Sequence, residues 1–405
     1  MWNSSVDKIL QVYNHAKEHT DFYKNHFSQN EEILTNDDFE KIPLLTKKDI
    51  RDNYTRLLTE GVTEENCIPY WTSGSTGIPV KYLRSKEEFF FNTMSLCRER
   101  KRISEKAFKG PICHFDKIKE PLKFIYNGHE KKELILSLYE NNDERYKLFV
   151  SAINEFKPTI LQGYASSLFE FAKYININKI NMTKIQLVEN RSEHLTDGQR
   201  SEIAEAFGGT VTNMYGLAEL FPIAYECKYK KMHICSDNVF LEVLSESNES
   251  DFGEIVVTSL NCKTLPLIRY RTGDIGKIDK QECTCGRLEP VLTLAQGRLS
   301  DYIITPNGRM NPVLLRRLFR YLYEDENSPI IQLQFIQVTI YDFIVKAISK
   351  GGATTETENK IRELVLSSFP YTVSVTVEWV ETLEFHPITR KVSSFISLID
   401  GGVKG

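Results

Sequence analysis

The chain has 405 residues with a formal net charge of −4, 41% apolar residues and 26% charged residues. This length and composition are typical of a globular protein of two or three domains. The slightly acidic balance gives no overall attraction to nucleic acid or to a membrane, so neither is expected as a partner. No apolar run could span a membrane, and the first 19 residues lack the apolar core of a secretion signal. We therefore expect a cytoplasmic protein, in which the eight cysteines form no disulfide framework.

Helices and strands alternate in the first part of the chain. Apolar residues recur at helical spacing within residues 4–27, and Thr46 is placed to cap the next helix. Further helices are predicted over residues 86–106 and 143–156. Residues 157–175 and 185–216 each read as a strand, a turn and a helix, and the second segment continues through Gly-Gly into another strand. This alternation favours an α/β layered fold.

The pattern changes after about residue 239, where short predicted strands are separated by turn residues. We interpret residues from about 225 to 296 as a β-rich subdomain of a large N-terminal domain that covers residues 1–298. Residues 299–405 read as a small α+β domain of the size of a lid, with one helix near residues 355–369 on a small mixed sheet. The domain boundary is expected near Gly297–Asp301.

One loop consists only of threonine, serine and glycine: Thr72, Ser73, Gly74, Ser75, Thr76 and Gly77. It is not a Walker-type phosphate loop, because Gly74 and Gly77 are only three residues apart and no lysine follows. The loop can instead be interpreted as a phosphate-binding loop of another type, a phosphate cradle. Glycines let the backbone approach an anion, while N–H groups and hydroxyls surround its oxygens. The loop by itself does not distinguish this cradle from a solvated surface loop.

Four later segments resolve the ambiguity. They read "NMYGLAEL" (213–220), "YRTGDIG" (270–276), "GRLSDYIITPNGRMNP" (297–312) and "PITRKVSSF" (387–395). In this order, downstream of the loop, they resemble the adenylate-forming superfamily, whose members activate carboxylic acids with ATP. The segments "IPLLTKKDIRDN", "LQGYASSL", "SEHLTDGQR" and "CTCGR" resemble its phenylacetate–coenzyme A ligase-like branch, as does the short chain. Each motif is weak alone, and the ordered set carries the resemblance.

The resemblance implies a role for each matching residue. The loop from Thr72 to Gly77 would hold the β- and γ-phosphates of ATP, and Glu219 would help to hold Mg²⁺. Asp274 would accept hydrogen bonds from the ribose hydroxyls, and Lys391 would neutralise charge as the carboxylate attacks the α-phosphate. The remaining implied nucleotide contacts are Asn213, Met214, Tyr215, Gly216 and Arg298. The implied acid-binding residues are Gly163, Tyr164, Glu193, Leu217 and Ala218, and His114 is a further candidate.

Three positions depart from the family pattern. Ile78 stands where relatives often have lysine, so one phosphate contact is in doubt. Ser300 stands at the position of a frequent acidic or lysine hinge, which leaves the hinge residue open. Arg390 replaces the glycine that usually precedes the catalytic lysine, and this weakens the alignment of Lys391.

A second group of residues has the composition of a metal site. Cys227, His233, Cys283 and Cys285 offer three thiolates and one imidazole, a set that suits a closed tetrahedral zinc site of the structural type. Cys235 competes as a ligand, and the alternative to a metal site is four free thiols with an exposed histidine. Some members of the branch carry such a zinc. The other four cysteines, Cys67, Cys97, Cys113 and Cys262, are predicted to be core residues.

These motifs predict an ATP- and Mg²⁺-dependent ligase that converts a carboxylic acid to acyl-AMP with release of pyrophosphate. The acyl group would then pass to a thiol, either coenzyme A or the phosphopantetheine arm of a free-standing carrier protein, while the small domain rotates between the two half-reactions. The branch favours an aromatic acid. The alternative is a nucleotide-binding protein of a capsule or other biosynthesis cluster, with the same fold, that makes an amide or no thioester. A homodimer is compatible with the sequence.

Overall fold

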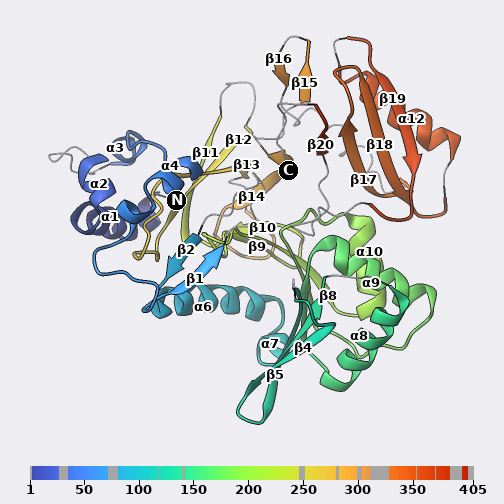
Figure 1. Ribbon diagram of the computed structural model, residues 1–405, viewed down its shortest axis with the longest axis horizontal. Helices are drawn as coiled ribbons and strands as arrows, with labels where there is room; N and C mark the ends of the chain where they lie inside the picture. The colour runs from blue at the N-terminus through green and yellow to red at the C-terminus, as the bar shows by residue number, and fades with distance from the viewer. Residues whose placement is uncertain are drawn as a thin grey trace. The chain divides into compact units, whose positions relative to one another are not determined.

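The computed structural model of the chain confirms the α/β class that the alternating pattern predicted (Figure 1). It describes residues 2–26, 35–71, 81–116, 118–138, 142–245, 251–279, 282–298, 303–306, 308–310, 328–352, 354–369, 371–383 and 395–399. Backbone contacts divide the chain into a first unit, residues 1–99 and 214–295, and a second unit, residues 100–213 and 296–404. Each unit is described on its own below. The predicted boundary between residues 298 and 299 adjoins undescribed residues and stays a prediction.

The N-terminal helices of the first unit are short. They are α1 (Trp2–His19), α2 (Asp21–His26), α3 (Asn36–Glu40), α4 (Lys47–Asp52) and α5 (Tyr54–Leu57). Thr46 caps α4 as predicted, because its hydroxyl accepts the Asp49 N–H while the Asp49 carboxylate accepts the Thr46 N–H at 2.8 Å. The single helix predicted over residues 4–27 is wrong in one respect, since it is broken at Thr20. The Thr20 hydroxyl bonds back to the Ala16 carbonyl at 2.8 Å and accepts the Tyr23 N–H at 3.2 Å, so it ends one helix and starts the next.

The strands of the first unit form an antiparallel hairpin and part of a larger sheet. The hairpin is β1 (Ile68–Trp71) with β2 (Lys81–Arg84), and α6 (Lys86–Ile103) follows it. The sheet strands are β9 (Ala224–Glu226), β10 (Met232–Ile234), β11 (Val239–Leu244), β12 (Gly253–Ser259), β13 (Tyr270–Asp279) and β14 (Val291–Arg298). Their order is β11-β12-β13-β14-β10-β9. Buried apolar residues of these strands, including Phe240, Val257 and Leu292, share one core with Phe39 of α3.

The second unit begins with parallel strands covered by helices. The strands are β3 (Ile112–Asp116), β4 (Leu122–Asn127), β5 (Glu130–Ser137), β6 (Ile160–Gly163), β7 (Leu187–Arg191) and β8 (Thr210–Tyr215), whose last two residues belong to the first unit. The order β7-β6-β3-β5 is parallel throughout, and β4 adds an antiparallel edge. The helices are α7 (Glu105–Phe108), α8 (Asp143–Phe156), α9 (Ala165–Ile177) and α10 (Asp197–Phe207). Within the described residues, no helix is both long and apolar enough to cross a membrane.

A glycine pair lets the chain turn sharply from α10 into β8. Gly208 ends the helix with a φ of +68°, and its N–H donates to the Ala204 carbonyl at 2.9 Å. Gly209 follows at a close backbone approach, because a Cβ there would lie 1.8 Å from the Ile185 carbonyl oxygen. The strand–turn–helix–Gly-Gly–strand pattern predicted over residues 185–216 is therefore confirmed, and both glycines have a steric reason.

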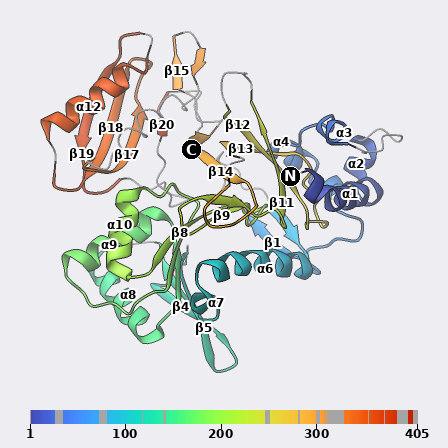
Figure 2. The ribbon, with the colours of Figure 1, turned by 180° about the vertical axis from the view of Figure 1, so that it is seen from behind.

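In the last part of the second unit, the described residues form a four-stranded sheet and the helix α12. Its strands are β17 (Ile330–Gln337), β18 (Asp342–Ser349), β19 (Ser374–Trp379) and β20 (Phe395–Ser397), in the order β19-β18-β17-β20. The short hairpin of β15 (Ile303–Thr305) and β16 (Gly308–Met310) precedes it. The helix α12 (Thr355–Leu366) covers one face through Ile361 and Val365 (Figure 2). The described residues are consistent with the predicted arrangement of one helix on a small mixed sheet, whereas a separate small domain and its movement as a lid stay predictions.

Candidate functional site

The turn that follows β8 holds the predicted magnesium ligand. In this turn the Leu217 N–H donates to the Leu220 carbonyl at 3.0 Å, and the Leu220 N–H donates to the Leu217 carbonyl at 3.1 Å. Arg84 of β2 fixes it further by donating to the Ala218 carbonyl at 2.6 Å. A Cβ on Gly216 at the start of the turn would lie 3.2 Å from the ring of Phe221, a tight contact. Leu217 and Ala218 therefore belong to a turn that hydrogen bonds hold in place.

Glu219 projects from this turn into a phenol-lined environment. Its side chain is 7% exposed, and its Oε1 accepts a hydrogen bond from the buried Tyr270 hydroxyl at 2.8 Å. Burial and the nearby Glu219 carboxylate hold the pKa values of Tyr82 and Tyr270 well above their usual range, so both phenols stay neutral. The other carboxylate oxygen, Oε2, has no hydrogen bond to a described residue. One anionic oxygen thus remains for a cation or a ligand donor.

A β-bulge presents Asp274. Glu254 of β12 pairs with Ile275, and Val256 pairs with Arg271. One residue of β12 therefore lies opposite residues 272–274 of β13, which defines the bulge. Gly273 supplies the necessary positive φ of +75°. The Asp274 carboxylate accepts a hydrogen bond from the Tyr215 hydroxyl at 2.8 Å. The structure therefore brings together two residues that sequence analysis assigned to the nucleotide, from strands 59 positions apart.

Several predicted nucleotide residues lie outside the described residues. The loop from Thr72 to Gly77 and the segment with Lys391 are in this class, as are Ile78, Ser300 and Arg390. Arg298 ends β14, but the structure describes only its backbone. Met214 is buried in β8 next to Tyr215. Their assignment to ATP stays a prediction.

The predicted acid-binding residues of the second unit gather after β6 and β7. Gly163 ends β6 where a Cβ would lie 3.0 Å from Phe115 and from Leu168, and Tyr164 then caps α9. Burial raises the pKa of the Tyr164 phenol.

Glu193 and Asn213 are held by defined hydrogen bonds in the same unit. Glu193 accepts the Ser166 N–H at 2.8 Å, and Asn213 accepts the amide of Asn190 at 2.8 Å. The Asn190 Oδ1 atom is buried and accepts no hydrogen bond from a described residue.

A row of polar side chains that the motifs did not single out crosses the same sheet. The register aligns His114 of β3 with Gln162 of β6, and Gln162 with Glu189 of β7. Arg100 of α6 binds Glu189 with two hydrogen bonds of 2.8 and 2.9 Å, and Gln162 also donates to Glu189. Glu189 is completely buried, and Arg100 and Gln162 are each 6% exposed. Only His114 was a candidate from the sequence, because the row depends on strand register.

His114 is the member of the row whose side chain forms no hydrogen bond with a described residue. It is half-buried, and its ring forms no hydrogen bond to a described residue. Burial, with Arg191 and Arg100 nearby, lowers its pKa to about 4. The imidazole is therefore neutral at physiological pH and offers one donor and one acceptor.

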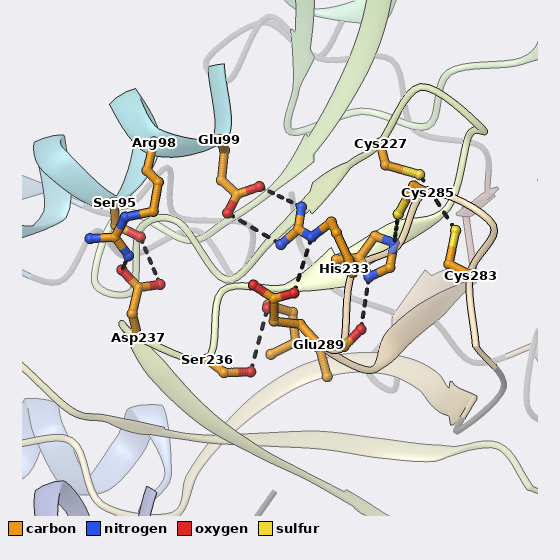
Figure 3. A network of polar contacts seen from close by, with 12 residues as sticks. Ser95, Arg98, Glu99, Cys227, His233, Ser236, Asp237, Cys283, Cys285 and Glu289 are labelled. Carbon is orange, nitrogen blue, oxygen red and sulfur yellow. Dashed lines mark hydrogen bonds and ion pairs between the residues drawn. The ribbon is translucent and has the colours of Figure 1, made fainter. Parts of the chain in front are cut away.

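The four predicted metal ligands converge in the first unit (Figure 3). The ligand atoms of Cys227, His233, Cys283 and Cys285 all lie within 4.8 Å of one another. The Cys227 and Cys283 sulfurs are 3.8 Å apart, and the Cys285 sulfur is 3.3 Å from His233 Nε2. Tetrahedral Zn²⁺ with sulfurs at about 2.3 Å would place two of them about 3.8 Å apart. The residues present therefore fit this metal.

The surroundings of the four ligands fix the histidine tautomer. His233 is fully buried in β10, and its Nδ1–H donates to the Glu289 carbonyl at 2.7 Å, so Nε2 is left for a metal (Figure 3). Arg287 binds Glu99 of α6 at 2.6 Å and Glu289 at 3.3 Å. The ligand-bearing loop is thus tied to α6 by a partly buried ion pair.

The other cysteines divide into two groups. Cys235, the competing ligand, is 1% exposed and is not a member of the four-residue group that the described residues form. Cys113 and Cys262 are buried, as predicted. Cys67 and Cys97 are only half-buried, so their prediction as core residues is wrong. Cys67 follows directly after the exposed residues 63–66, in agreement with its partial exposure.

Comparison with known proteins agrees with this geometry. No family model matches the chain. It is 27% identical over 377 residues to protein CapK of Staphylococcus aureus, an alignment that covers 88% of this chain and 80% of CapK. It is 26% identical over 295 residues to phenylacetate-coenzyme A ligase of Thermus thermophilus, covering 68% of this chain and 64% of that ligase. The chain thus spans less than two thirds of the length of the Thermus protein.

The fold also matches a solved ligase. A crystal structure of 2-hydroxyisobutyryl-CoA ligase in the postadenylation state superposes with a TM-score of 0.72 at 16% identity, covering 98% of this chain and 89% of that one. With the motif geometry, these likenesses agree with the resemblance of the sequence to the adenylate-forming superfamily of ligases. The relatives named phenylacetate-coenzyme A ligase agree with its resemblance to that branch.

Proposed function

We propose that this chain activates a carboxylic acid with ATP to give acyl-AMP and pyrophosphate, and then transfers the acyl group to a thiol. The observation that carries the proposal is the placement of Glu219 and Asp274. Both carboxylates lie on rigid backbone of the first unit, each is oriented by a tyrosine, and Glu219 keeps one oxygen unused. This arrangement fits a divalent cation with phosphate at Glu219 and a ribose at Asp274.

In the first half-reaction a carboxylate oxygen of the acid would attack the α-phosphorus of ATP, and pyrophosphate would leave. Magnesium, when bound, neutralises phosphate charge, and Glu219 with its Tyr270 hydrogen bond would hold it. The adenine would lie beside Tyr215 and Gly216. Lys391 would supply a positive charge at the α-phosphate, and the C-terminal sheet would move so that the thiol can enter for the second half.

Coenzyme A is the proposed acceptor, because relatives and structural neighbours are named coenzyme A ligases. A carrier-protein thiol is the second candidate acceptor. An aromatic acid is the proposed substrate class on the strength of the phenylacetate-coenzyme A ligases in the branch. In the second unit the residues proposed to contact it are Gly163, Tyr164 and Glu193.

We also propose a structural zinc at Cys227, His233, Cys283 and Cys285. The supporting observations are the mutual distances of the ligand atoms and the fixed tautomer of His233. With four protein ligands the coordination shell is closed, so the metal would stabilise the loop between β13 and β14 and would not touch the acid.

The proposed function has a direct test. Purified protein supplied with Mg²⁺, ATP, labelled pyrophosphate and a panel of carboxylic acids is expected to exchange label into ATP with its cognate acid and without any thiol. The exchange follows from the reversibility of acyl-AMP formation. Formation of ADP and phosphate, or exchange that strictly requires a thiol, would contradict an adenylate intermediate.

The role of Glu219 gives a second expected result. Glu219→Gln should slow exchange by at least about tenfold at low Mg²⁺, because an amide oxygen is a weaker ligand for this cation than a carboxylate. Raising the Mg²⁺ concentration should recover part of the rate. The exposed Glu65→Gln variant is the matched control and should behave like wild type. A loss that is the same at every Mg²⁺ concentration would argue against a magnesium ligand at this position.

A further inference from the structure

The polar row in the second unit has a feature that a purely apolar substrate does not explain. His114, Gln162 and Glu189 are neighbours in register on three parallel strands, so their side chains leave the sheet on the same face. Two positions earlier on the same strands, that face carries Ile112, Ile160 and Leu187. These three pack against Ala107 in a small apolar cluster. The face therefore changes from apolar to polar toward the carboxyl ends of the strands.

The opposite face of these strands shows that the change is local. Cys113, Leu161 and Val188 occupy the intervening positions, and all three are fully buried in the main core of the unit. The polar row is not simply a solvated surface either, because Glu189 has no exposure and Gln162 has 6%. Burying such groups is costly unless they are hydrogen-bonded. Glu189 meets this condition through Arg100 and Gln162, whereas His114 has no hydrogen bond to a described residue.

Charges of both signs lie around the row. Arg100 forms its two hydrogen bonds with Glu189, and Arg191 and Asp116 lie at the strand ends close enough to influence His114 in opposite directions. The buried carboxylate of the row is thus already paired. The His114 ring, which has no hydrogen bond to a described residue, suits a neutral polar group of a substrate.

Unused hydrogen-bonding capacity is concentrated at the same end of the sheet. The neutral His114 ring offers a donor and an acceptor, and neither is bonded to a described residue. The Arg191 Nε and the Asn190 Oδ1 are buried and have no hydrogen-bond partner in the described part of the chain. The carboxyl ends of parallel strands are where ligands bind in open α/β sheets. A hydroxyl group both donates and accepts, so it matches an imidazole of this kind.

We infer that the acid activated by this protein carries a hydroxyl group, which His114 binds at the carboxyl ends of β3 and β6. Gln162, Glu189 and Arg100 are positioning residues that keep this end of the sheet polar and rigid. The inference rests on the proposed adenylation and refines its substrate class, whether the carbon skeleton is aromatic or aliphatic. His114 then determines specificity and takes no part in the chemical step.

Pyrophosphate exchange with matched pairs of acids tests this inference. Suitable pairs differ by one hydroxyl: phenylacetate and 4-hydroxyphenylacetate, benzoate and 4-hydroxybenzoate, butyrate and 3-hydroxybutyrate. The pair that contains the acid with the highest kcat/KM decides the test. In that pair the hydroxylated acid should have a kcat/KM at least about tenfold higher than the acid without the hydroxyl, because sites built to bind a hydroxyl strongly reject analogues without it. His114→Leu should bring that ratio close to one, mainly through KM, and His114→Gln should retain most of it.

Control variants separate specificity from stability. His129→Leu replaces an exposed histidine of the same unit and should leave the ratio unchanged. Melting curves of the His114 variants should stay cooperative, so that a changed ratio reports binding. A preference for the unsubstituted acid, or a ratio that a folded His114→Leu protein preserves, would overturn this inference and leave adenylation standing. Absence of exchange with every acid would overturn the proposed function as well.

Discussion

Replacing Lys391 by alanine is expected to slow adenylation by about 10²–10³-fold, the usual cost of removing one preorganised group that stabilises developing charge. The motif "PITRKVSSF" carries this assignment, and the residue lies outside the described residues. Pyrophosphate exchange with the cognate acid measures the effect. The change should fall on kcat more than on KM, because the lysine acts as charge develops on the α-phosphate.

The second half-reaction distinguishes a swinging lysine from a general loss of activity. Thioester formation from presynthesised acyl-adenylate and coenzyme A should proceed at close to the wild-type rate in Lys391→Ala. Lys360→Ala changes an exposed lysine on α12 and should affect neither half. Equal losses in both halves would mean that Lys391 is misassigned or that the C-terminal sheet does not alternate between two positions.

Loss of the metal site is expected to have the largest effect on stability. Wild-type protein should contain about one zinc per chain by elemental analysis, and Cys285→Ser should contain almost none. Saturating metal at about a thousand times its dissociation constant contributes about 4 kcal/mol to the free energy of unfolding. At about 2–4 °C per kcal/mol, the variant's melting temperature should fall by about 10 °C. Cys283→Ser should behave in the same way.

Cys235→Ser is the matched control for the zinc prediction. Its sulfur is buried and lies outside the ligand group, so the variant should retain metal. Adenylation per folded molecule should change little in the ligand variants, since a closed coordination shell has no position for substrate. Protein that is stable and free of metal after gentle purification would refute the zinc site. The proposed chemistry would be unaffected, because neither Glu219 nor Asp274 is a ligand.

Much of the candidate site was predictable because its residues occur in short motifs. Glu219 and Asp274 were identified by the segments around them, and the four metal ligands by residue type and spacing. The structure adds what such segments cannot encode. The Tyr270 hydroxyl that orients Glu219 lies 51 positions away in the chain, and no local pattern marks it as a partner. Tyr270 begins the segment "YRTGDIG", but only Asp274 of that segment was given a role, in binding the ribose.

The polar row was not predicted from the sequence for a related reason. His114, Gln162 and Glu189 come from strands that follow one another in the chain at large intervals, so only the register of a parallel sheet makes them neighbours. The break between α1 and α2 was missed because the apolar spacing continues across it. The Thr20 hydroxyl ends the helix there by donating to the Ala16 carbonyl, in competition with backbone N–H groups. The spacing of apolar residues gives no sign of such a hydrogen bond.

Two consecutive residues of the helix α6 form ion pairs with different partners. Glu99 pairs with Arg287 beside the metal ligands of the first unit, and Arg100 pairs with Glu189 in the polar row of the second. A helix turns by about 100° per residue, so inserting one residue between them would move one charge away from its partner. A buried charge without its partner is strongly destabilising. Evolution can therefore vary exposed positions of α6 such as Phe90, but it has little freedom to change the length of this helix.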